Sequence, residues 1–420
     1  MTRLRDRLSV LRLPNFRNLF IGQTVSLFGN GLVPVALTFG VLDLTGSGTD
    51  VGIVLAAFAL PGILFTLVGG VWADRLRRER ILIVSDLLRF TVMALIATLL
   101  LSDQAQVWSL ALLGFTFGCG EAFFLPAVSA LMPQIVPEER LQDANALRGV
   151  ADGLGWFVGP TLSGVLVALI GAGGALAIDA ATFLVSAAFL LALRVPPLQH
   201  TGKRRAFFAE LREGWREVRS HNWLWVMMLS TMLVIFVSLS PLQVLGPLAI
   251  TERQQSPALW GSLTGLLSLG MLAGGFVALY YRPRRPLVSV TLLGLTVSAP
   301  AIALALDPSP AALWTVWVLR GVAVGVHMAL WATTLQREIP GESLGRVSSW
   351  DWMVSGGLWP LGLILAGPLV DVMGLTPVLW LSGVLGIACG LWVLLVKDVR
   401  TLAWRPAAPR PDEETAPGAG

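Results

Sequence analysis

Long apolar runs alternate with short polar segments over most of the chain. Each run has about 20 to 30 residues, enough for a helix to cross a hydrocarbon core of about 30 Å at about 1.5 Å per residue. The pattern predicts twelve transmembrane helices, numbered here as spans 1 to 12. Six runs contain no Asp, Glu, Lys or Arg: 18–42, 51–73, 223–250, 257–281, 286–306 and 375–396. Six carry one to three ionisable groups: roughly 81–102, 107–136, 144–170, 174–193, 312–336 and 347–373.

One stretch of the chain occurs twice. Residues 137–174 align without a gap to residues 340–377, near half a chain length away. The matched positions include Pro137/Pro340, Trp156/Trp359, Gly153/Gly356, Gly159/Gly362, Gly164/Gly367 and Gly171/Gly374. Such a repeat indicates two homologous halves, as many transporter folds have. We expect an all-α integral membrane fold with two pseudo-symmetric six-helix bundles, at 17–193 and 223–397.

Composition and charge place these bundles in a membrane. The chain is 55% hydrophobic and 13% charged, with a mean hydropathy of +0.73, too apolar for a water-soluble domain of this length. Lys and Arg lie in the tails and in alternate loops, apart from Arg89, Arg253 and Arg320. The positive-inside rule therefore predicts that both termini are cytoplasmic. The pI of about 9.7 reflects this topology, so we expect no nucleic-acid partner.

The remaining segments are predicted to lie outside the bilayer. Residues 1–16 form a cytoplasmic tail, and residues 194–222 form a cytoplasmic linker between the bundles. Apolar residues recur in the linker at helical spacing opposite three arginines, which predicts an amphipathic helix on the inner membrane surface. Its apolar residues are Phe207, Phe208, Leu211, Trp215 and Val218, and its arginines are Arg212, Arg216 and Arg219. The tail at 398–420 is rich in Pro, Ala and Glu and is expected to be disordered.

Polar residues inside the spans are the candidate functional groups. In span 1, Gln23, Ser26 and Asn30 are three and four residues apart and share one helical face. They either form hydrogen bonds between helices or line a cavity. In span 3, Asp86 and Arg89 are three residues apart, and we expect a structural ion pair in preference to a coupling role.

Four more ionisable residues lie within spans. Glu121 in span 4 is near mid-membrane with no basic partner in its own helix, so it is a candidate proton-coupling carboxylate, with a hydrogen-bonded structural role as the alternative. Asp179 lies near the outer end of span 6. Arg320 and His327 share one face of span 10. Arg320 needs an acid or an anionic ligand, and Glu121 is its candidate partner by depth alone. His327 is either structural or a proton carrier.

The loop after span 2 carries a family resemblance. Gly70, Ala73, Asp74, Arg75 and Arg78 match the loop 2–3 signature of the major facilitator superfamily, whereas Trp72, Arg77 and Glu79 depart from it. The resemblance implies a transporter fold, with Asp74 and the arginines locking the cytoplasmic helix ends together in the outward-open state. A merely basic loop is the alternative.

Span 5 carries a second resemblance. Gly155, Gly159, Pro160 and Gly164 resemble the antiporter signature of the same superfamily, which favours export over import. Small residues at this spacing let helices approach closely, and Pro160 removes a backbone donor. Helix packing alone would explain the glycines but not the Gly-Pro pair.

No motif suggests catalysis or ATP hydrolysis. Cys119 and Cys389 both fall within spans, and we expect neither a metal site nor a cofactor. The stretches 123–127, 144–146 and 179–183 resemble the branch that contains macrolide efflux proteins and the enterobactin exporter. The resemblance implies a monomeric, proton-coupled exporter of a small amphipathic or anionic molecule in a bacterial plasma membrane. The alternatives are a proton-coupled importer of the same fold and a non-transporting membrane scaffold.

Overall fold

The computed structural model describes residues 8–73, 77–195 and 207–403, and gives the backbone alone at 8, 66–73, 130, 156, 207–211 and 342. Helices make up nearly all of these residues, and no strand occurs among them. Eleven described helical segments are long and apolar enough to cross a membrane. One of them, Glu138–Leu191, has 54 residues, and Gly171 breaks it with a φ of 76° and a ψ of 169°. It therefore supplies two spans, and the total of twelve agrees with the prediction.

The first half begins with the short helix η1 (Leu8–Arg12). Span 1 is broken into α2 and α3 at Gly31 and Leu32, just before Pro34, which cannot donate a backbone hydrogen bond. Spans 5 and 6 are the two parts of α7, which follows the short helix η2 (Glu138–Arg140). The helices are α2 (Pro14–Asn30), α3 (Val33–Thr45), α4 (Gly48–Ala73), α5 (Arg78–Leu101), α6 (Val107–Ile135) and α7 (Leu141–Leu191).

The second half repeats this arrangement with more interruptions. Span 7 joins α9 and α10 through a π-helical turn, η3, and span 9 joins α12 and α13 through a 3-10 turn, η4. Span 11 consists of α15 and α16. The elements are α8 (Phe207–Ser220), α9 (Asn222–Val234), η3 (Ile235–Leu239), α10 (Ser240–Glu252), α11 (Pro257–Tyr280), α12 (Pro286–Gly294), η4 (Leu295–Ser298), α13 (Ala299–Leu306), α14 (Pro310–Glu338), α15 (Gly341–Gly356), α16 (Trp359–Met373), α17 (Leu375–Leu391), η5 (Trp392–Leu395) and α18 (Lys397–Thr401).

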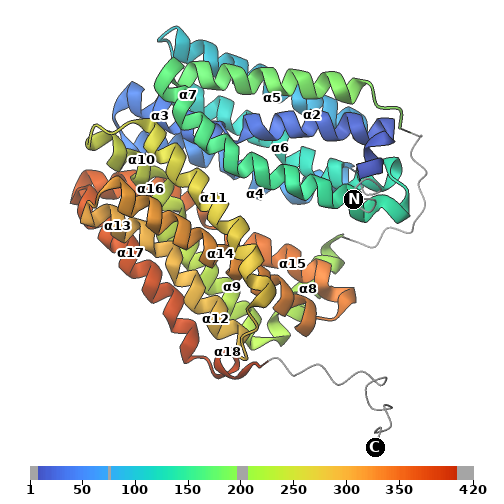
Figure 1. The fold of residues 1–420 in the computed structure, drawn as a ribbon, viewed down its shortest axis with the longest axis vertical. Helices are drawn as coiled ribbons and strands as arrows, with labels where there is room; N and C mark the ends of the chain where they lie inside the picture. Colours follow the sequence, from blue (N-terminus) through green and yellow to red (C-terminus); the bar gives the residue numbers. More distant parts are fainter. Residues whose placement is uncertain (1–7, 74–76, 196–206, 404–420) are drawn as a thin grey trace, which may run out of the picture.

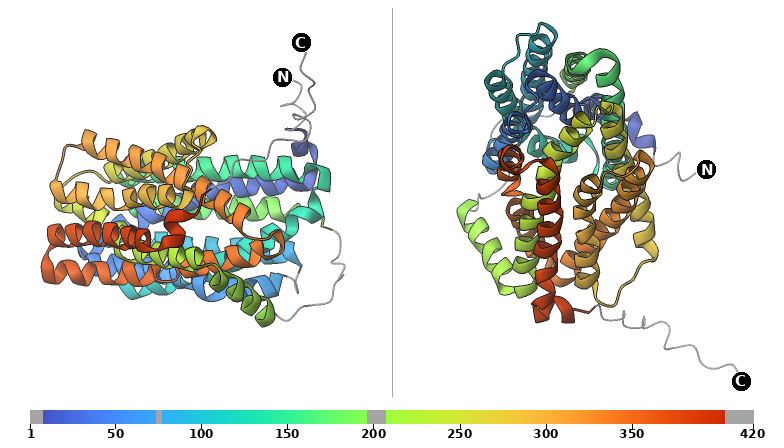
Figure 2. Two further views of the ribbon diagram at one scale, coloured as in Figure 1. Left: turned by 90° about the horizontal axis from the view of Figure 1, so that it is seen from below. Right: turned by 90° about the vertical axis from the view of Figure 1, so that its left-hand side faces the viewer.

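The two halves form two bundles that meet at one end and diverge at the other (Figures 1 and 2). They meet where α3, α10 and α16 lie, which we call the loop end because short connections such as Gly46–Ser47 join the helices there. They diverge toward η1, α8 and α18, which we call the terminal end.

Glycines make the contact between the bundles. A methyl group added at Gly367 in α16 would lie 2.1 Å from the backbone nitrogen of Thr49 in α4. A methyl group at Gly164 in α7 would lie 2.9 Å from the Cα of Gly261 in α11. Backbones can approach this closely only where side chains are absent, so spans 2 and 11, and spans 5 and 8, cross at glycine.

The linker contains a helix where the sequence predicts one, and helices also reach into both segments predicted as tails. Within the linker the helix α8 packs on α15: the rings of Trp215 and Trp350 lie 4.7 Å apart, and Arg346 Nη1 donates to Glu213 Oε2 at 2.7 Å. Helical structure also continues into both segments that the sequence predicts as tails. Helices η1 and α2 begin before residue 17, and α18 runs to Thr401 because Val399 is fully buried.

Candidate functional site

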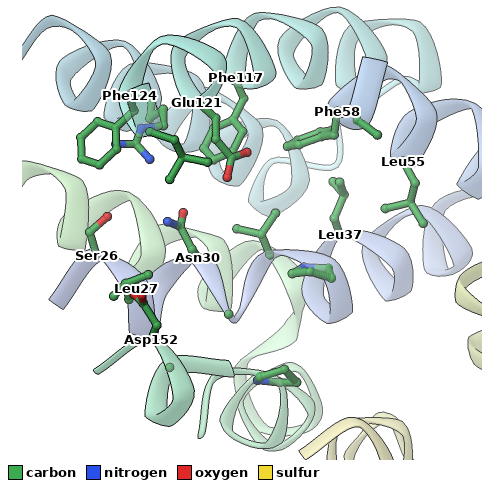
Figure 3. Close-up of a pocket in the computed structure, with 18 of the residues that line it drawn as sticks. Ser26, Leu27, Asn30, Leu37, Leu55, Phe58, Phe117, Glu121, Phe124 and Asp152 are labelled. Atoms are coloured by element: carbon green, nitrogen blue, oxygen red, sulfur yellow. The ribbon is translucent and has the colours of Figure 1, made fainter. Parts of the chain in front are cut away.

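A cavity of about 490 Å³ lies between the two bundles (Figure 3). Most of its wall comes from spans 1, 2, 4 and 5, and the second half contributes three residues. The wall combines aromatic and aliphatic side chains with amides and ionisable groups, the composition typical of small-molecule sites. Its polar members are Gln23, Ser26, Asn30, Arg89, Glu121, Arg148, Asp152 and Gln243, and its apolar members include Leu37, Leu55, Phe58, Phe117, Phe124, Trp359 and Leu363.

The polar face of span 1 forms one side of the cavity. Gln23, Ser26 and Asn30 all line it, as does Pro34. Gln23 is only 8% exposed, and its Nε2 has no hydrogen-bond partner among the described residues. Of the two interpretations left open by the sequence, the structure favours cavity lining over bonding between helices.

Glu121 faces this stripe from span 4. Figure 3 shows its carboxylate on α6 pointing toward Asn30 on α2, with Phe117 and Phe124 on either side. The side chain is exposed to the cavity, so water or a ligand can reach the carboxylate.

Span 5 contributes a second pair of charges. Arg148 and Asp152 lie four residues apart on α7, line the same cavity, and interact electrostatically. The antiporter signature that follows is a packing surface. Gly155 lies against Leu27, Gly159 against Gly31, and Gly164 against Gly261. The Ser163 hydroxyl donates to the Leu32 carbonyl at 2.7 Å, which satisfies an acceptor at the break in span 1.

Span 3 holds a buried ion pair. Arg89 Nη2 donates to Asp86 Oδ1, and the two side chains are 2% and 0% exposed. The Arg89 guanidinium also stacks on two aromatic rings, 4.1 Å from the Phe124 centroid and 4.6 Å from the Phe183 centroid. The pair expected from the sequence is thus present, and Arg89 also reaches the cavity wall.

Asp179 of span 6 lies behind that wall. It is 0% exposed and interacts electrostatically with Arg89 and Glu121. Four ionisable residues from three helices therefore form one cluster: Asp86, Arg89, Glu121 and Asp179. We refer to them as the acidic cluster.

The predicted residues of span 10 lie elsewhere. His327 Nδ1 donates to the Val290 carbonyl at 2.8 Å, a bond between α14 and α12. Arg320 is 5% exposed, and within the described residues it has neither an ion pair nor a partner for its Nε. The structure contains no Glu121–Arg320 pair in this conformation, since similar depth does not make two residues neighbours across a bundle.

The loop 2–3 signature is described only in part. Gly70 lies in the last turns of α4, and Arg78 is the first residue of α5. Asp74 and Arg75 lie outside the described residues.

Several polar cavity residues, among them Arg89 and Arg148, were not identified as such from the sequence. The sequence predicts Arg89 as part of a structural pair and does not single out Arg148. The spacing of Arg148 and Asp152, one helical turn apart, was the available signal.

Two bundles of six spans around a cavity are the architecture of many membrane transporters. The sequence model of the Major Facilitator Superfamily matches residues 19–361. The chain belongs to this superfamily.

Its relatives include two named efflux proteins. It is 26% identical over 394 residues to macrolide efflux protein A of Streptococcus pyogenes, covering 92% of this chain and 97% of the relative. It is 31% identical over 362 residues to the multidrug efflux pump Tap of Mycolicibacterium fortuitum, covering 83% and 87%. A crystal structure of the nucleoside transporter NupG superposes with a TM-score of 0.74 at 13% identity, covering 90% of this chain and 98% of that one, which shows the shared fold.

Proposed function

We propose that this protein is a secondary active exporter of a small amphipathic molecule in a bacterial plasma membrane, acting as a monomer. The observation that supports it best is the cavity between the bundles. Its volume of about 490 Å³ falls within the range of about 300–1,000 Å³ for sites that hold drug-sized ligands. Its mixed wall suits a molecule with both an apolar body and polar groups.

The orientation follows from the distribution of charge. The basic residues gather in the tails and in alternate loops, which supports placing the terminal end on the cytoplasmic side. The bundles are closed at the loop end and diverge at the terminal end. The structure would then be an inward-facing state, in which the cavity receives substrate from the cytoplasm.

The direction of transport rests on two supports. The relatives above are named as efflux proteins, and the Gly-Pro pair at Gly159 and Pro160 resembles the antiporter signature. Coupling to protons is supported by Glu121, a carboxylate that faces the cavity within a span. An exporter coupled to proton entry must bind a proton and a substrate in different states of one cycle.

The test is transport in inverted membrane vesicles, with radiolabelled erythromycin as a macrolide probe and a panel of other amphipathic compounds. We expect accumulation inside the vesicles that requires an inward-acidic proton gradient. Gradient-driven depletion would indicate an importer. Absence of flux for every compound, with the protein folded and inserted, would indicate a scaffold and contradict the proposal.

A further inference from the structure

The acidic cluster contains a charge imbalance. Asp86 and Arg89 satisfy each other as a buried ion pair, with the guanidinium held between Phe124 and Phe183. Asp179 adds a second buried carboxylate. Glu121 is exposed to the cavity, so the buried members are two carboxylates and one guanidinium, and one negative charge has no balancing group among the described residues.

The surroundings of Asp179 leave that charge unsolvated. The residue is 0% exposed, and neither carboxylate oxygen has a hydrogen bond of good geometry among the described residues, although the Thr182 hydroxyl lies close enough to interact with the carboxylate. The neighbouring Thr182 hydroxyl donates to the backbone carbonyl of Asp179 at 2.7 Å. On the α2 side Gly29 lies close, because a methyl group added there would lie 2.4 Å from Asp179 Oδ1.

An isolated carboxylate in such a place is energetically prohibitive. Burying an ionised carboxylate without a partner costs several kcal/mol even after relaxation. Arg89 lowers that cost for one carboxylate, but its charge is already matched by Asp86. Glu121 raises the cost, because it lies close enough to repel Asp179 and is itself an acid.

We propose that Asp179 is a proton-binding site, protonated in this conformation while Asp86 stays ionised beside Arg89. The proton comes from water in the cavity, which reaches Glu121 and Arg89 at the cavity wall. The inference deepens the proposed function, because it assigns the coupling proton to the buried aspartate behind Glu121. Glu121 is then the group through which the proton enters and leaves.

A bound metal cation accounts for the charge imbalance less well than a proton does. Hard cations take several oxygen ligands, and ordered sites supply them from carboxylates, carbonyls and water. No group of three or more His, Cys, Asp or Glu suited to a metal occurs among the described residues. The close approach of Gly29 fills the space beside Asp179. A proton requires no such space.

The experiment is infrared spectroscopy of the full-length protein in lipid, which measures the carbonyl stretch of a protonated carboxyl without any substrate. We expect a buried protonated-carboxyl band at neutral pH in the wild type. It should be lost in Asp179→Asn, and also in Asp86→Asn, where Asp179 becomes the ionised partner of Arg89. In Arg89→Gln the carboxyls of both Asp86 and Asp179 should be neutral, so the intensity of the band should double. Glu121→Gln removes a neighbouring acid that repels the Asp179 carboxylate, but the band should remain, because Asp179 stays buried and Arg89 stays paired with Asp86.

The outcomes separate this inference from the proposed function. A band that persists in Asp179→Asn and disappears in Glu121→Gln would place the proton on Glu121 and overturn the inference, while proton-coupled transport would stand. A band absent from the wild type in sodium-free buffer would also overturn it. A band that sodium chloride removes, and potassium chloride does not, would identify a sodium site instead. Thermal unfolding of each variant checks that the chain is folded.

Discussion

The two copies of the internal repeat share their geometry. Both copies place glycine where span 5 or its counterpart, span 11, meets other helices. Gly159 packs against span 1, and its counterpart Gly362 packs against span 7. Gly164 lies where span 5 crosses span 8, and its counterpart Gly367 lies where span 11 crosses span 2. Gly171 and Gly374 both have positive φ, at 76° and 82°, in the turns that lead to spans 6 and 12. The repeat therefore preserves the helix crossings of the fold.

The chemistry of the two copies differs. Arg148 and Asp152 of the first copy line the cavity, whereas the aligned positions in the second are Asp351 and Ser355. Asp351 Oδ2 accepts a hydrogen bond from Trp331 at 2.8 Å and Oδ1 accepts one from Ser355 at 3.3 Å. The first half thus carries the ionisable cavity groups, and the second half uses the same helix position for packing. A symmetric scaffold holds an asymmetric site.

The largest expected effect comes from neutralising the cavity carboxylate of the first half. Glu121→Gln should abolish uphill, gradient-driven flux and retain substrate exchange, because an amide cannot release a proton. The comparison variant in the second half is Asp351→Asn, at the position that aligns with Arg148. It should keep uphill flux, since it removes at most hydrogen bonds of about 1 kcal/mol. Flux in inverted vesicles measures both, and equal behaviour of the two variants would refute the asymmetry.

A smaller effect is expected where the two halves cross. Gly367→Val should open the loop end, because even its first added carbon would lie 2.1 Å from the Thr49 nitrogen. Overpacking costs roughly 1–3 kcal/mol, which shifts a conformational equilibrium by about 5- to 150-fold. The readout is thiol labelling of Ser47→Cys in a protein without Cys119 and Cys389.

Gly356→Val is the matched control on the same span. A methyl group at Gly356 meets nothing within 4 Å, so labelling at the loop end should stay low. If both valine variants label alike, glycine packing does not hold the loop end closed.

A substitution in the loop 2–3 signature is expected to lower the transport rate by about tenfold. Asp74 follows span 2, and the corresponding loop after span 8 lacks an aspartate. We expect Asp74→Asn to weaken the proposed cytoplasmic gate by about 1.5 kcal/mol, the lower end of the range for one hydrogen bond to a charged group, so transport should fall by about tenfold. Membrane insertion should not change, because topology follows the arginines. Transport at the wild-type rate in this variant would show that Asp74 does not contribute to the gate.

The smallest effect concerns a single hydrogen bond between the halves. Thr49 Oγ1 donates to Asp371 Oδ2 at 2.8 Å at the loop end. Thr49→Val removes a bond worth about 0.5–1.5 kcal/mol, and should raise thiol labelling of Ser47→Cys by about twofold to tenfold. Labelling no higher than in the parent protein would show that glycine packing alone keeps this end closed.

The sequence by itself determined the architecture of this protein. Apolar run length sets the number of spans, because a helix must cross a bilayer of fixed thickness with its backbone hydrogen bonds satisfied. The repeat of 137–174 at 340–377 predicted two related bundles. These features are local in the chain or periodic along it, so they can be read without knowing which helices touch.

Only the tertiary structure decided which polar residues share a site. Depth along a helix can be estimated by counting residues, but the direction in which a side chain points around the bundle depends on packing against other helices. Depth alone suggested Arg320 as the partner of Glu121, whereas the structure places Arg89 and Asp179 beside it. His327 turned out to bond a neighbouring backbone carbonyl. The charge imbalance at Asp179 became visible only once three helices had been brought together.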